Sequence, residues 1–135
     1  MKQQPIVEVS HEIDLTIKYN GRKYIGYAIC HPDDEEFFSE KVGKNIAYMR
    51  ACINAMFGER AKARKEYEFL KNFYANYRQN HEPSADLESA IAEAEKHFHY
   101  YQRKYRECKQ ELKEYLLNHE KVLESLRRQR KAKTN

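Results

Sequence analysis

Six side chains in this sequence have types and spacings that suit a phosphorylated aromatic ligand. A guanidinium group donates paired hydrogen bonds to a phosphate, and a flat ring stacks on a base. The predicted ligand-binding residues are three arginines for phosphates and three rings for stacking: Arg50, Arg103, Arg106, Phe73, Tyr77 and Tyr100. Arg50 stands alone, off the apolar pattern, where an arginine is usually solvated. The set predicts the binding of such a ligand. We expect no cofactor and no metal ion.

The same rings also fit a different role. Phe69 and Phe73 lie one helical turn apart and form an apolar stripe. Such a stripe is typical of an interface between two copies of a chain, with Arg103 and Arg106 as its charged rim. Both interpretations hold if a ligand lies between the copies, so the residues leave both open.

Arg60 and His119 interrupt otherwise apolar patterns. Folding the helical region about residue 83 places Arg60 beside Tyr105 and Arg106. One interpretation is that Arg60 extends to water or pairs with a nearby glutamate. The other is that Arg60 is a cation held for a bound anion. Neither interpretation is excluded by the sequence.

The sequence holds no pattern that supports catalysis, so we expect a protein that is not an enzyme. It contains no zinc-ligand spacing, phosphate-binding loop, G-x-S-x-G motif or plausible catalytic triad. His31 precedes four acids in residues 33–36, which raises the question of a divalent metal site. Because their spacing fixes no ligand geometry, a solvated entry to a helix is the simpler interpretation.

Two long helices are predicted to position these residues. In the first, apolar side chains recur at steps of four and three, which is the pattern of a helical seam. Its members are Val42, Ile46, Met49, Ile53, Met56, Ala63, Tyr67, Leu70, Tyr74 and Tyr77. Gly58 lies within this pattern without changing its phase, so we expect one continuous helix.

A second seam begins after Pro83. It comprises Leu87, Ile91, Ala94, Phe98, Tyr101, Tyr105, Cys108, Leu112, Tyr115, Val122 and Leu126. Two helices of nearly equal length joined by a short turn should form an antiparallel hairpin. Because two such helices cannot bury all their rings in one another, we expect a second copy of the chain to cover them.

The first 38 residues are predicted to form a small antiparallel sheet. Apolar and polar residues alternate from Val7, and Asn20-Gly21 indicates a hairpin turn. A two-residue turn would send Ile25, Tyr27 and Ile29 to the polar face. We therefore expect a three-residue loop, residues 19–21, which pairs Leu15 with Ile25 and Ile13 with Tyr27 and keeps one face apolar. Ser39 is the predicted N-cap of the first helix, with Phe37 or Phe38 folded back onto the sheet.

Composition supports this α+β organisation, with residues 1–38 as the sheet and 39–135 as an oligomeric helical hairpin with a basic tail. The 135 residues are 34% charged, and 11 Tyr and 6 Phe would be costly to leave in water. Three scattered cysteines are typical of reduced thiols. No apolar run is long enough to cross a bilayer, so we expect a cytoplasmic protein without a membrane partner.

Three short runs are similar to a pattern found in small proteins of bacteriophages that infect Gram-positive bacteria. They are AICHPDD at 28–34, EKVGKNIA at 40–47 and RA at 50–51. With a β-rich start and two long helices, the chain resembles the first Thoeris anti-defence family. The resemblance implies a sponge that is a homodimer or a higher assembly of homodimers. Such a protein encloses a cyclic ADP-ribose isomer, in some members also cyclic oligonucleotides, without reacting with it, inside the infected bacterium.

Two other functions remain open from the sequence. The first is a nucleic-acid-binding protein that uses its basic C-terminus: residues 127–133 carry five cations, which are expected to fray from the helix end, although a short basic tail is weak evidence for this function. The mild formal net charge of +4 favours anionic partners without requiring nucleic acid. The second alternative is a coiled-coil interaction protein whose rings only hold subunits together.

Overall fold

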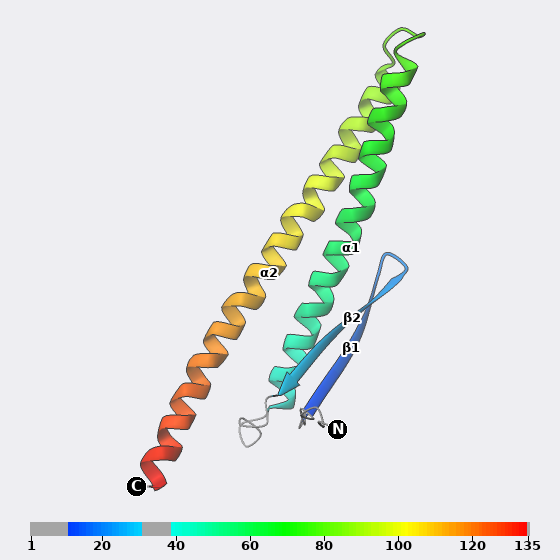
Figure 1. Ribbon diagram of the computed structural model, residues 1–135. Coiled ribbons are helices and arrows are strands. Elements are labelled where there is room, and N and C mark those ends of the chain that lie inside the picture. The colour runs from blue at the N-terminus through cyan, green and yellow to red at the C-terminus, as the bar shows by residue number, and fades with distance from the viewer. Residues whose placement is uncertain (1–10, 31–38, 135) are drawn as a thin grey trace, which may run out of the picture. The chain divides into compact units, whose positions relative to one another are not determined.

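The computed structural model describes residues 11–30 and 39–134, and it confirms the predicted α+β fold class. Two antiparallel strands, β1 (His11–Tyr19) and β2 (Arg22–Cys30), precede two long helices, α1 (Glu40–Tyr77) and α2 (Ala85–Thr134) (Figure 1). The chain divides into two compact units, residues 1–52 with 110–135 and residues 53–109. Both helices contribute to both units, and each unit is described by itself below.

The predicted register of the hairpin is wrong. Tyr19 pairs with Arg22 and Ile17 with Tyr24, so the turn has two residues rather than three. Asn20 and Gly21 both have positive φ, 49° and 75°, as a two-residue turn that matches the twist of the strands requires. A shift of one residue exchanges the two faces of β2.

Close packing on α1 explains why the sheet adopts this register. Gly26 and Ala28 of β2 lie buried on the inner face. A Cβ atom on Gly26 would overlap the carbonyl oxygen of Ala47 and lie 2.5 Å from the backbone nitrogen of Ala51. Ala47 and Ala51 are fully buried. Small side chains on both sides therefore let strand and helix backbones meet, and Ile25, Tyr27 and Ile29 face outward.

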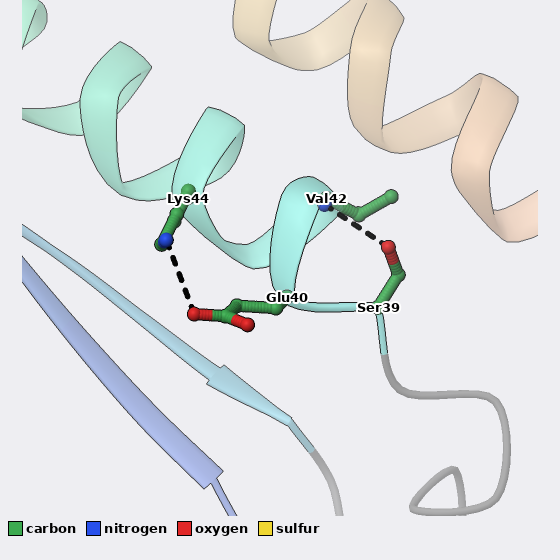
Figure 2. Close-up of polar contacts among 4 residues, drawn as sticks. All are labelled: Ser39, Glu40, Val42 and Lys44. Carbon is green, nitrogen blue, oxygen red and sulfur yellow. Dashed lines mark hydrogen bonds and ion pairs between the residues drawn. The ribbon is translucent and has the colours of Figure 1, made fainter.

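The start of α1 has the predicted N-cap (Figure 2). The Val42 N–H donates to Ser39 Oγ at 3.3 Å, and the Gly43 N–H donates to the Ser39 carbonyl at 2.9 Å. Glu40 and Lys44, one turn apart, form an exposed ion pair at 3.1 Å. The Ser39 side chain thus satisfies the Val42 N–H, which has no backbone partner within the helix, and the Ser39 carbonyl accepts the first hydrogen bond of the helix. Phe37 and Phe38, predicted to pack against the sheet, lie outside the described residues.

The helical seams are largely as predicted. All ten seam residues of α1 are buried or half-buried, and α1 continues through Gly58. In α2 the prediction is wrong at Val122, which is 55% exposed, while its neighbour Leu123 is buried. A helix with 3.6 residues per turn drifts by about 20° per heptad, so after several heptads the facing position moves along by one residue.

The lengths of the two helices differ more than predicted. Helix α1 has 38 residues and α2 has 50. The basic residues 127–133, expected to fray, belong to α2 in the structure. Their side chains therefore follow a helical arrangement up to the end of the described chain.

Tyr74 stabilises the turn between the helices through two hydrogen bonds. Its hydroxyl donates to Glu88 Oε1 at 2.7 Å and accepts the Ser84 N–H at 3.3 Å. Ser84 in turn caps α2, since its Oγ accepts the Leu87 N–H at 3.3 Å. Tyr74 thus joins the last turn of α1 to the first turn of α2.

Tyr74→Phe is expected to lower the melting temperature, because it removes both hydrogen bonds of the hydroxyl. The hydrogen bond to Glu88 raises the pKa of Tyr74, with a smaller contribution from burial. A raised pKa in the folded state stabilises the fold below the ordinary value of about 10 and loses this effect as pH rises further. Melting curves should therefore separate the two proteins at neutral pH and converge above pH 10. A constant difference across that range would contradict this account.

Candidate functional site

Arg60 lies over two neighbouring aromatic rings in the unit formed by residues 53–109. Its guanidinium carbon is 4.4 Å from the centroid of Tyr105 and 5.3 Å from that of Phe57. The two rings are 5.8 Å apart. Phe57 and Arg60 are three residues apart on α1, so they share a face, and Tyr105 reaches them from α2. The predicted proximity of Arg60 and Tyr105 is confirmed.

The contacts with the two rings leave the N–H donors of Arg60 available. A guanidinium held against a ring uses its flat face, while its five N–H groups point outward in the plane. Within residues 11–30 and 39–134, Arg60 makes no ion pair or side-chain hydrogen bond; its contacts are with the two rings. The glutamate partner considered from the sequence is thus not present in the described chain. Arg60 is a half-buried cation whose donors suit an external anion.

A second cation shares the Tyr105 ring. Lys109 Nζ lies 5.2 Å from its centroid, four residues further along α2. Arg106, three residues before Lys109, is exposed. Neither Lys109 nor Arg106 has an acidic partner among the described residues. We call Phe57, Arg60, Tyr105 and Lys109 the Arg60 cluster, and it combines two cations with a half-exposed apolar ring.

The predicted pair Tyr100 and Arg103 lies on a different surface. An open groove of about 840 Å³ is lined by Glu66, Leu70, Ala90, Glu93, Ala94, Lys96, His97, His99, Tyr100 and Arg103. Arg103 and Lys104 lie 5.8 and 5.7 Å from the Tyr100 ring. Both cations also approach Glu107, at 3.8 and 3.4 Å. Glu107, together with Glu66 and Glu93 in the lining, weakens the attraction of the groove for an anion.

Three other predicted ligand-binding residues, Arg50, Phe73 and Tyr77, contact neighbouring residues of the same chain. Arg50 Nη1 donates to the carbonyl of Tyr27 at 2.8 Å, which ties α1 to β2. Phe73 stacks on Phe69 with centroids 6.4 Å apart, and Tyr77 stacks on His81 at 4.2 Å. Their roles in ligand binding stay predictions, as does that of Arg106.

Phe57 and Lys109 were not among the residues predicted to bind the ligand. The signals that would have identified them are local. Phe57 precedes Arg60 by three residues and lies off the seam, and Lys109 follows Tyr105 by four. Both spacings place a cation beside a ring on one helical face.

The described residues offer little for metal or redox chemistry. Among them, no group of three His, Cys, Asp or Glu residues could hold a metal ion. His31 and the acids at 33–36 lie outside the described residues. Cys52 and Cys108 are half-buried and form no disulfide bond. In the part of the chain that the structure covers, no helix is long and apolar enough to cross a membrane.

Comparison with protein-family models gives no match, and comparisons with curated proteins and with solved structures give no significant match. The Thoeris anti-defence resemblance therefore depends on the residues quoted for it and on the order of the elements.

Proposed function

We propose that the protein is a sponge that binds a small cyclic nucleotide and does not react with it. The observation that carries the proposal is the half-buried guanidinium of Arg60, which lies against two rings and whose N–H groups have no acceptor among the described residues. A phosphate oxygen is an acceptor that matches this planar fork. Lys109 adds a second positive charge within reach of the same ring.

Phe57 supplies a surface for the aromatic part of the ligand. This ring is 52% exposed beside Arg60, so part of its surface is open to a ligand. A purine stacked on Phe57 would place its attached phosphate toward the Arg60 donors. The resemblance then selects the ligand within this class: a cyclic ADP-ribose isomer or a cyclic oligonucleotide that serves as an immune signal in an infected bacterium.

The proposal includes a homo-oligomer. Phe69 and Phe73 are 66% and 49% exposed, and the groove near Tyr100 is open. A second copy that covers these rings would remove them from water and enclose a ligand bound nearby. Enclosure slows release, which is what a sponge requires.

A panel of cyclic ADP-ribose isomers and cyclic dinucleotides is expected to raise the melting temperature, with unphosphorylated adenosine as the control. A ligand at 100 times its dissociation constant adds about 2.7 kcal/mol to the free energy of unfolding. The bound nucleotide should be recovered with unchanged mass after denaturation. The proposal fails if no member of the panel shifts the melting curve, or if the recovered nucleotide has been cleaved.

A further inference from the structure

The outer face of the β1–β2 hairpin exposes large apolar residues that the proposed function does not use. Ile25, Tyr27 and Ile29 are 43%, 49% and 58% exposed. They alternate along β2 and so share one face. The inner face is the one that packs on α1, through Gly26 and Ala28. An apolar row of this size on a solvent-facing sheet is typical of an interaction surface.

Charge on this face is separated along the strands. At the turn end, Lys18 pairs with Lys23, so two cations lie side by side. At the open end, Glu12 is opposite Ile29, and Asp14 is opposite Tyr27. All of these side chains are exposed. The face therefore has a positive end, a negative end and an apolar row along β2.

We propose that this face binds the same face of a second copy of the chain. A two-fold axis that runs across the strands, between the sheets, reverses the strand direction and keeps β2 over β2. Lys18 of one copy then meets Glu12 of the other, and Tyr27 meets Ile25. A two-fold axis parallel to the strands would instead place lysines over lysines and acids over the apolar row. The first arrangement pairs Lys18 with Glu12 and packs Tyr27 against Ile25, while Ile29 lies opposite Lys23.

The charge pattern is the reason to choose a second copy as the partner. The same face carries both Lys18 and Glu12, and the two-fold axis of a homodimer brings each of them opposite the other in the second copy. The surface is small, because the sheet has two strands, and its area is at the low end for specific interfaces. We therefore expect weak association, with a dissociation constant in about the micromolar range. The Arg60 cluster takes no part, so the inference does not depend on the proposed function.

Sedimentation of the full chain over a range of concentrations tests the interface. Tyr27→Ser should halve the mass of the wild-type assembly at micromolar concentration. Lys18→Glu and Glu12→Lys should each weaken association by about tenfold, since each places like charges opposite one another. The double variant Glu12→Lys with Lys18→Glu should restore it, because the exchange recreates both pairs. Lys62→Glu, an exposed charge reversal on α1, is the control and should leave the mass unchanged.

Circular dichroism of every variant checks that helix content is retained, which is expected because the altered side chains are exposed. Failure of the double variant to recover the wild-type mass would overturn the proposed arrangement. A wild-type protein that is monomeric at all concentrations would overturn the interface. An assembly unaffected by Tyr27→Ser would do so as well.

Discussion

Arg60→Gln is expected to weaken binding of the cyclic nucleotide by about 30-fold. Hydrogen bonds to a charged group contribute about 1.5 to 3 kcal/mol each, and glutamine keeps one amide donor but loses the charge and the fork. Arg60→Lys should give an intermediate loss, because lysine keeps the charge without the planar stack on Phe57 and Tyr105. Isothermal titration calorimetry of the three proteins measures these changes.

Arg64→Gln is the matched control. Arg64 lies one turn from Arg60 on α1, but it is exposed and paired with Glu68 at 3.1 Å. Its loss should leave the affinity within about twofold, because an exposed pair of this kind contributes little. If Arg60→Gln bound the nucleotide as tightly as the wild type, the Arg60 cluster would not be the phosphate site.

Gly26→Ala is expected to destabilise the sheet by about 3 kcal/mol. The added methyl group would meet backbone atoms of Ala47 and Ala51, which cannot rotate away as a flexible side chain can. Either the strand withdraws from α1 or the helix bends. Amide hydrogen exchange in β1 and β2 measures this local stability separately from that of the long helices.

Gly21→Asn provides the comparison for Gly26→Ala. Gly21 has a φ of 75°, but nothing lies within 4 Å of a Cβ atom placed there. Asparagine tolerates this backbone conformation, so exchange protection should change by less than about 1 kcal/mol. Equal protection in Gly26→Ala and the wild type would show that the close contact with α1 does not hold the sheet in place.

The helices could be predicted because their evidence is repeated many times along the chain. Each turn of α1 adds another seam residue, and Ser39 supplies a local cap. The hairpin register has no such redundancy, since one residue in the turn decides which face of β2 is buried. The sequence pattern favoured burying Ile25 and Tyr27. The Asn20-Gly21 turn and the small residues Gly26 and Ala28 determined the opposite arrangement, because the helix backbone needs the space.

The candidate site was predictable only in part. Folding the helices about residue 83 was enough to bring Arg60 to Tyr105, because both positions lie on the seam. Whether a cation has an acidic neighbour depends on side-chain positions that spacing does not determine. Arg103 approaches Glu107, and Arg50 binds a carbonyl of β2, whereas Arg60 contacts only rings among the described residues. That difference separates a candidate phosphate site from a structural arginine.

The most direct test of nucleotide binding at Arg60 observes its own N–H group. A nitrogen–proton correlation spectrum of the arginine Nε–Hε groups would be recorded while a cyclic ADP-ribose isomer is added, with the Arg60 signal assigned by its absence in Arg60→Gln. The account predicts that the Arg60 signal shifts until the ligand saturates, while the Arg64 signal stays in place. An Arg60 signal that remains unchanged in excess nucleotide would contradict it.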